Sequence, residues 1–209
     1  MLNVRLTTLF DTPATARLSA EDYIASPQSE HKSDLIEGVF VMASPATFEH
    51  AALQSFLLTT ISNFVGANEL GIVLGENAAY RLNTDNVYQP DSSFLSRDRM
   101  YLAGEVYVNG APDLAVEIIS PSSRQYDSVE KRINYGRAGV REYWLVDPIT
   151  RTVTIFELVI DQLFPLCAEG GVLRSKVLAG FWLRVDWIFP PAGARRPGEL
   201  EIARAQGLT

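Results

Sequence analysis

The stretch PDLAVEIISPSS, residues 112–123, combines a buried strand with acidic side chains. The apolar run at 114–119 is typical of a strand inside a sheet. Because side chains alternate between the two faces of a strand, Glu117 shares a face with Ala115 and Ile119. A carboxylate in mid-strand must be protonated, hydrogen-bonded, ion-paired or bound to a metal, because burying an isolated charge costs several kcal/mol. The residues alone allow each of these, including a structural ion pair with an arginine or lysine.

A second acidic residue occurs in a similar context, in YQPDSSFLS, residues 88–96. Asp91 follows Pro90 at the entrance of a short predicted strand. Two carboxylates from neighbouring strands, with no cysteine or histidine cluster beside them, offer the hard oxygen ligands that Mg²⁺ and Mn²⁺ prefer. A metal held there could activate water and neutralise a phosphodiester in its transition state.

Length and composition indicate one soluble globular domain. The chain has 209 residues, of which 47% are hydrophobic and 21% charged. We expect a single domain over 1–192, with its core at about 20–190, and a C-terminal tail or helix at 193–209. No window approaches the roughly 20 apolar residues that cross a bilayer, and a single cysteine excludes an internal disulfide, so we expect a cytoplasmic protein without a membrane partner. The net charge of -7 argues against a non-specific nucleic-acid binder but allows a local basic cleft.

Two helices are predicted around these strands. Apolar positions recur mostly at helical spacing from Phe48 to Gly66, which indicates the long helix of the domain. The segment YDSVEKRINYGRAGV, residues 126–140, begins with Asp127 as a candidate N-cap and ends at Gly139.

On a helical wheel of this second helix, the apolar residues form one stripe and the polar residues another. Val129, Ile133, Gly136 and Val140 share the apolar stripe, and Asp127, Lys131 and Tyr135 lie on the other side. The wheel alone favours a solvated Asp127–Lys131 pair worth about 0.3 kcal/mol.

The order of these motifs resembles known nucleases. Pro90-Asp91, Glu117 and a following lysine resemble the PD-(D/E)XK nuclease superfamily. Further motifs narrow the resemblance to the Uma-two family of restriction-endonuclease-like proteins, over about residues 20–190: LIEG, SPATFEH, QPDSSFL, PDLAVEIISPSS, YDSVEKRINYGRAGVREYWLVDP and VLAGF.

The resemblance implies a fold and an activity. The fold is α/β (α+β) and restriction-endonuclease-like, with a central mixed β-sheet flanked by helices. The implied activity is Mg²⁺-dependent (or Mn²⁺-dependent) endonucleolytic hydrolysis of phosphodiester bonds in nucleic acid, with DNA as the expected substrate. A homodimer would suit an enzyme that cuts both strands of a duplex.

The resemblance also implies site residues. Asp91 and Glu117 would bind the metal. Ile119 stands where the E-x-K form has its lysine, and Lys131 on the next helix matches the lysine of the Uma-type pattern. His50 would be an auxiliary acid, base or ligand.

Several further residues resemble family positions, but the case for placing them in the site is weaker. Glu49 could face the cleft from the start of the long helix, although a helix N-terminus favours an acid without any function. Asp34 and Glu37 match acidic family positions and could border the cleft, whereas Asp113 and Ser120 also have a plain reading as strand-end hydrogen-bonding residues.

Two other function classes compete with a nuclease. A non-catalytic interaction module could keep the fold and lose the chemistry, which the net charge and the displaced lysine favour. A hydrolase of small phosphorylated molecules would suit the acidity, but the sequence has no phosphate loop. In support of a nuclease, four arginines are predicted to cluster near the site: Arg124, Arg132, Arg137 and Arg141.

Overall fold

The predicted strand at 114–119 lies in the middle of a six-stranded sheet. The computed structural model describes residues 17–27, 31–120, 124, 126–166 and 170–208. The sheet order is β10-β9-β8-β7-β6-β3, in which β7 pairs in parallel with β8 and every other pairing is antiparallel. The strands are β3 (Gly71–Gly75), β6 (Ser92–Ser96), β7 (Leu114–Ile118), β8 (Glu142–Asp147), β9 (Thr152–Val159) and β10 (Gln162–Leu166).

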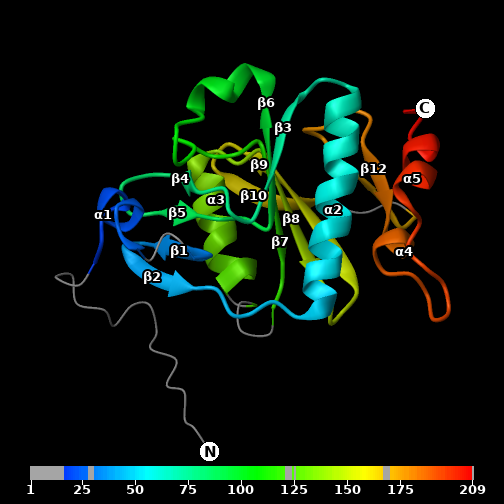
Figure 1. Ribbon diagram of the computed structural model, residues 1–209, viewed down its shortest axis with the longest axis horizontal. Coiled ribbons are helices and arrows are strands. Elements are labelled where there is room, and N and C mark those ends of the chain that lie inside the picture. The colour runs from blue at the N-terminus through cyan, green and yellow to red at the C-terminus, as the bar shows by residue number, and fades with distance from the viewer. Residues whose placement is uncertain (1–16, 28–30, 121–123, 125, 167–169, 209) are drawn as a thin grey trace, which may run out of the picture.

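Helices cover both faces of this sheet (Figure 1). Helix α2 (Phe48–Ala67) packs on one face, in a core shared with Val116 and Ile118. The π-helix η5 (Tyr126–Lys131) and helix α3 (Arg132–Ala138) lie on the other face, in a core shared with Ala115. The predicted α/β (α+β) architecture, with a central mixed sheet flanked by helices, is therefore confirmed.

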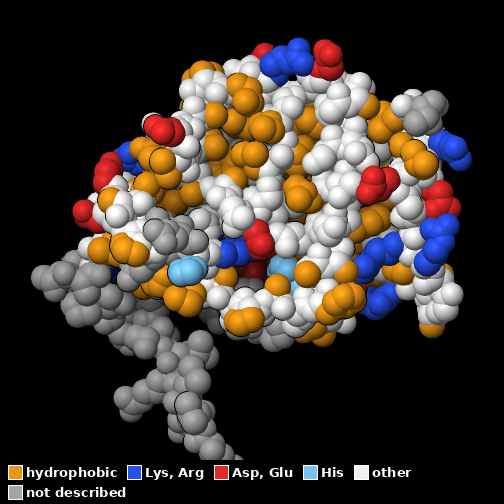
Figure 2. Space-filling model, viewed as in Figure 1, with side chains coloured by type: hydrophobic (Ala, Val, Ile, Leu, Met, Phe, Trp, Pro, Cys, Tyr) orange, Lys and Arg blue, Asp and Glu red, His pale blue; other side chains and the backbone are white. Residues whose placement is uncertain are grey.

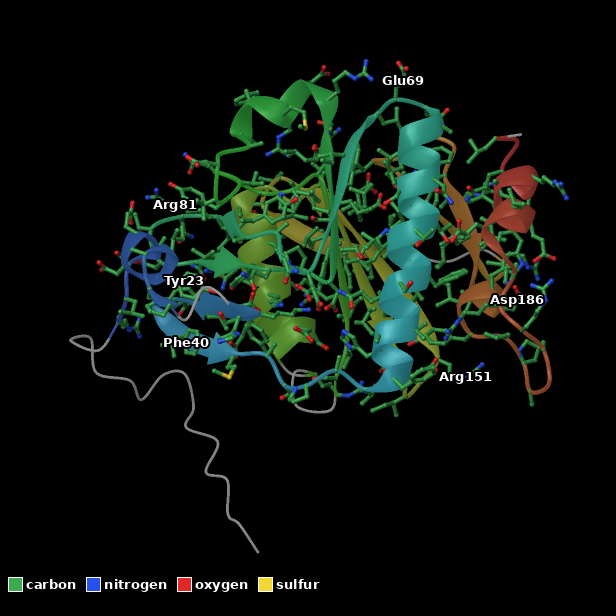
Figure 3. The ribbon with its side chains drawn as sticks, viewed as in Figure 1. Tyr23, Phe40, Glu69, Arg81, Arg151 and Asp186 are labelled. Carbon is green, nitrogen blue, oxygen red and sulfur yellow. The ribbon has the colours of Figure 1, made fainter. Side chains whose placement is uncertain are left out.

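A smaller antiparallel sheet lies beside the π-helix side of the molecule and has the order β2-β1-β5-β4. The ring of Tyr23 in helix α1 lies 6.2 Å from that of Phe40, and its hydroxyl donates to the Ser33 carbonyl at 2.8 Å (Figure 3). These contacts hold helix α1 against the start of β1 and against β2. The elements are α1 (Ala20–Ile24), β1 (Ser33–Ile36), β2 (Val39–Met42), β4 (Tyr80–Arg81) and β5 (Val87–Tyr88).

The C-terminal part of the chain packs on the α2 side of the molecule. Helix α5 contacts α2, and Arg196 donates to Glu49 at 2.8 Å. Among the residues described, no helix is long and apolar enough to span a membrane. The remaining elements are the 3₁₀ helix η4 (Arg97–Leu102), β11 (Val172–Arg174), β12 (Trp182–Arg184), α4 (Val185–Ile188) and α5 (Glu199–Ala205).

The helical wheel of the 126–140 segment was wrong about which residues are buried. Val129 and Ile133 are 44% and 43% exposed, whereas Asp127 and Lys131 are buried. The wheel separates the two sides of the helix, but the polar side is the buried one, because Lys131 pairs there with Glu117 and Asp34 in the interior. Gly139 ends the segment in the left-handed conformation, as predicted.

Candidate active site

Strand pairing places Asp91 opposite Glu117. Ser92 is the partner of Val116 in the antiparallel pair β6–β7. Asp91, directly before Ser92, therefore lies opposite Glu117, directly after Val116. Opposite residues of an antiparallel pair have side chains on the same face, about 5 Å apart at Cβ. A hydrogen bond of 2.7 Å from the Ile118 N–H to Asp91 Oδ2 fixes the carboxylate at this point. The two acids, 26 positions apart in the chain, therefore meet at one end of the central sheet.

The carboxylate of Asp91 is buried and is held in its charged form by two basic side chains. Its Oδ1 contacts Lys32 Nζ and lies 3.2 Å from His50 Nε2. Burial alone would raise the pKa of Asp91, but His50 and Lys32 outweigh it and lower the pKa to about 2. His50 reaches this position because Thr47 caps α2 and accepts the His50 N–H at 3.1 Å.

Glu117 lies in an environment of the opposite kind. Its Oε1 accepts hydrogen bonds from Lys131 Nζ at 2.7 Å and from the Tyr135 hydroxyl at 2.8 Å. Burial is the main cause that raises the pKa of Glu117 to about 8; Lys131 opposes the shift, and nearby acids, Asp91 first, add to it. Two neighbouring carboxyls thus have pKa values pushed far apart, which is a feature of acid–base sites.

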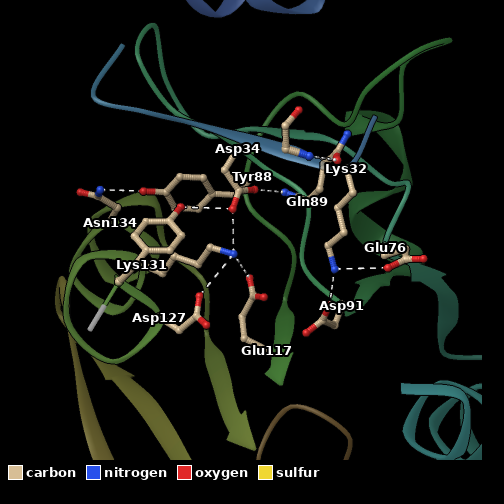
Figure 4. Close-up of polar contacts among 12 residues, drawn as sticks. Lys32, Asp34, Glu76, Tyr88, Gln89, Asp91, Glu117, Asp127, Lys131 and Asn134 are labelled. Carbon is tan, nitrogen blue, oxygen red and sulfur yellow. Dashed lines mark hydrogen bonds and ion pairs between the residues drawn. The ribbon is translucent and has the colours of Figure 1, made fainter. Parts of the chain in front are cut away.

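Lys131 is the counter-ion of a buried acidic cluster and not a solvated surface residue. Its Nζ lies 2.7 Å from Glu117 Oε1, 2.9 Å from Asp34 Oδ2 and 3.7 Å from Asp127 Oδ1, and its side chain is 4% exposed (Figure 4). Burial alone would lower the pKa of Lys131, but these three acids outweigh it and raise the pKa well above its usual value. One ammonium shared by three carboxyls is consistent with Glu117 keeping its proton to a high pH.

Aromatic and amide groups fix the partners of Lys131 in place. The rings of Tyr126 and Tyr88 lie 5.1 and 5.7 Å from its Nζ, within the range of a cation–π contact. Asp34 accepts the Gln89 N–H at 2.8 Å and the Tyr126 hydroxyl at 3.2 Å. The cluster is therefore rigid on the β1 side as well as on the helix side.

Glu142, a second buried glutamate on the neighbouring strand β8, is an example of an acid with a structural role. Both carboxylate oxygens of Glu142 accept hydrogen bonds, from Trp144 Nε1 at 2.6 Å and from the N–H groups of Lys176 and Val177 at 2.6 and 3.1 Å. Within the described residues, by contrast, hydrogen bonds to Glu117 reach Oε1 and none reaches Oε2. Oε2 of Glu117 can therefore bind another partner.

The structure separates other predicted residues from the Asp91–Glu117 pair. Asp113 precedes β7, at the opposite end of the strand from Glu117, and it accepts the Ser96 N–H at 2.8 Å. Arg141 lies at that far end too, 3.3 Å from Asp113.

The predicted cluster of four arginines at the site is therefore wrong, because it combined residues from both ends of the sheet. Arg124 lies at the site end of β8 but forms an ion pair with Asp147 at 2.7 Å. Arg132 lies over the Phe156 ring, at 5.4 Å. Glu49 is paired with Arg196, and Glu37 is an exposed turn residue after β1.

Sequence reasoning missed Lys32, which contacts Asp91 and lies 3.3 Å from Glu76 Oε2. The chain has three lysines, Lys32, Lys131 and Lys176, and two of them lie at this site. Their scarcity was the available signal, because a cation is needed wherever acids are buried. Figure 2 shows acidic, basic and histidine side chains gathered around a recess at the lower centre of this face.

The carboxyl groups of Asp91 and Glu117 match the simplest kind of binding site for a hard divalent cation. Mg²⁺ is usually bound by one or two carboxylates and keeps several waters, and Asp91 and Glu117 supply two adjacent carboxyls. In the part of the chain that the structure describes, no group of three or more His, Cys, Asp or Glu side chains converges into a metal-binding set. The donors thus suit an ion that completes its shell with water and substrate oxygens.

The fold and the acid pair together define a protein of the restriction-endonuclease-like class. The sequence matches the family model of Uma2, described as "Putative restriction endonuclease", over residues 20–186. This match covers most of the chain, which therefore belongs to the Uma2 family.

A solved structure shares the fold. It is described as a putative nuclease belonging to DUF820 from Anabaena variabilis ATCC 29413, and it is 20% identical to this chain. The TM-score is 0.70, with 82% of this chain and 97% of that chain covered. No curated protein matches the sequence.

Proposed function

We propose that this protein is an endonuclease that hydrolyses phosphodiester bonds in nucleic acid, with DNA as the expected substrate, and that Asp91 and Glu117 hold Mg²⁺ or Mn²⁺. The observation that carries the proposal is the pairing of β6 with β7, which brings these two acids together at the sheet end. Membership of the Uma2 family supports a nuclease. When bound, a divalent cation would supply charge neutralisation at the phosphate and a more acidic water.

The protein's own residues have distinct roles in this proposal. Asp91 is held ionised and oriented by the Ile118 N–H and by His50. Glu117 is oriented by Lys131 and Tyr135, which leave its second oxygen to face the ligand. Lys131 also keeps a fixed positive charge next to the reacting phosphate, where negative charge develops in the transition state.

Metal binding is the first test. Calorimetric titration with Mn²⁺ should give a saturable heat with the wild type and none with the Asp91→Asn/Glu117→Gln double variant. Asp98→Asn is the matched control, because Asp98 is an exposed acid on η4. Equal, negligible heats for all three proteins would refute the metal site and favour a non-catalytic interaction module.

Nicking of supercoiled plasmid and cleavage of single-stranded DNA and RNA test the activity. We expect Mn²⁺-dependent product with the wild type, loss with Glu117→Gln, and no loss with Asp98→Asn. Metal binding without cleavage of any of these substrates would exclude a general endonuclease. The cytoplasmic location and the homodimer stay predictions.

A further inference from the structure

Two lysines reach the acid pair from opposite sides, and they differ in how firmly they are held (Figure 4). Lys131 comes from the π-helix, is 4% exposed and has three acidic partners. Lys32 precedes β1, its side chain is 25% exposed, and its partners are Asp91 and Glu76. Lys131 is thus built into the interior, whereas Lys32 reaches Asp91 from the solvent side.

The ammonium of Lys32 occupies the oxygen that a metal ion would need. It contacts Oδ1 of Asp91, which also lies 3.2 Å from His50 Nε2, while Oδ2 accepts the Ile118 N–H. A Mg²⁺ ion lies about 2.1 Å from a carboxylate oxygen, so an ammonium on the same oxygen would be a close like charge. Such a contact is unfavourable, so the two cations compete for this oxygen.

Glu76 offers the ammonium of Lys32 a second ionic partner. Its Oε2 lies 3.3 Å from Lys32 Nζ and its side chain is 40% exposed. The lysine stem has four flexible carbons, and a half-exposed carboxylate is a partner that costs little desolvation. Lys32 can therefore leave Asp91 without losing every ionic partner.

We propose that Lys32 is a displaceable counter-ion, which neutralises Asp91 in the metal-free protein and moves to Glu76 when a divalent cation binds Asp91 and Glu117. This inference rests on the proposed metal site. It makes Lys32 an internal competitor of the metal, which protects the protein from an unpaired buried carboxylate.

Calorimetry with Mn²⁺ alone measures the competition. Lys32→Met should tighten Mn²⁺ binding roughly tenfold, the factor expected when one charge-assisted hydrogen bond no longer competes. Lys32→Arg keeps the charge and should bind like the wild type, as should Lys176→Met, which changes an exposed lysine. An affinity of Lys32→Met equal to that of the wild type overturns the proposal.

Lysine reactivity in the wild-type protein gives a readout that needs no variant. Acetylation of Lys32 relative to Lys176, followed by mass spectrometry, should rise severalfold when Mn²⁺ is added, and Lys131 should stay protected. If Mn²⁺ binds and this ratio does not change, the displacement is refuted and the metal site stands. If Mn²⁺ binds neither the wild type nor Lys32→Met, the proposed metal site itself fails.

Discussion

Replacement of Lys131 by methionine should destabilise the protein strongly, because it removes the positive charge from a buried acidic cluster. Lys131 Nζ lies 2.7 Å from Glu117 and 2.9 Å from Asp34, and the side chain is almost fully buried. Methionine has a similar length and fills the same space, so the change removes charge with little loss of volume. We expect the free energy of unfolding to fall by about 3 kcal/mol at neutral pH.

The magnitude follows from opposing contributions. With an effective dielectric constant of about 20, two unit charges at the 2.9 Å that separates Lys131 Nζ from Asp34 Oδ2 attract by about 6 kcal/mol. Most of this attraction is offset by the cost of removing the charges from water, and breaking a buried pair typically leaves a loss of about 3–5 kcal/mol. The lower end applies here because the abandoned carboxyls can take up protons, at about 1.4 kcal/mol for each unit of pKa shift.

Urea unfolding followed by tryptophan fluorescence measures this loss. Lys176→Met is the matched control and should change stability by less than about 0.5 kcal/mol. Adding Asp34→Asn to Lys131→Met should recover about 1 kcal/mol or more, since one unpaired acid is then removed. A loss below about 1 kcal/mol for Lys131→Met, with an unchanged dependence on urea, would refute the role of Lys131 as the counter-ion of the cluster.

Three further changes test the description of the fold. Glu142→Gln should lower stability by about 2 kcal/mol in urea unfolding, because an amide cannot accept at both ends, and should leave Mn²⁺ binding unchanged. The pKa of Asp147 is lowered from 3.8 to about 2, chiefly by Arg124 against the opposing effect of burial, so its stabilisation is present above pH 3.8 and lost as the pH falls towards 2. Asp147→Asn should therefore flatten the loss of stability in that window, and an unchanged pH profile would contradict this. Gly136→Ala should destabilise by about 1–3 kcal/mol, because a Cβ would lie 2.8 Å from the Asp161 carbonyl oxygen; a higher melting temperature would show that β10 can move away.

The sequence predicts the central strand well because a nearly continuous apolar run is typical of a strand that is covered on both faces. Ala115 and Ile119 lie in the core on one side of the sheet, and Val116 and Ile118 in the core on the other, as alternation requires. The mid-strand position of Glu117 follows from the same pattern.

The composition of the site could be predicted less completely, because pairing register and helix type are not local properties. The residues around Asp91 do not specify that β6 runs antiparallel to β7. They also do not specify the register that places Asp91 beside Glu117. The wheel for Lys131 could not show which side of the helix is buried, because that depends on its tertiary partners Glu117 and Asp34. Lys32 directly precedes β1 of a second sheet, which docks through tertiary contacts such as that of Asp34 with Tyr126.

The balance of charge at the site connects its stability with its proposed chemistry. Four buried acidic side chains form the cluster around Lys32 and Lys131, namely Asp34, Asp91, Glu117 and Asp127, so acids exceed lysines by two; His50 also contacts Asp91. A fold selected for stability alone would replace such a cluster with apolar residues, because buried ion pairs rarely stabilise more than well-packed hydrophobic ones. A proton on Glu117, whose pKa is raised to about 8, balances part of this excess, and a divalent cation could take the place of that proton. Binding of Mn²⁺ should therefore raise the melting temperature of the wild type more than that of Asp91→Asn, and equal shifts would show that the excess is balanced in another way.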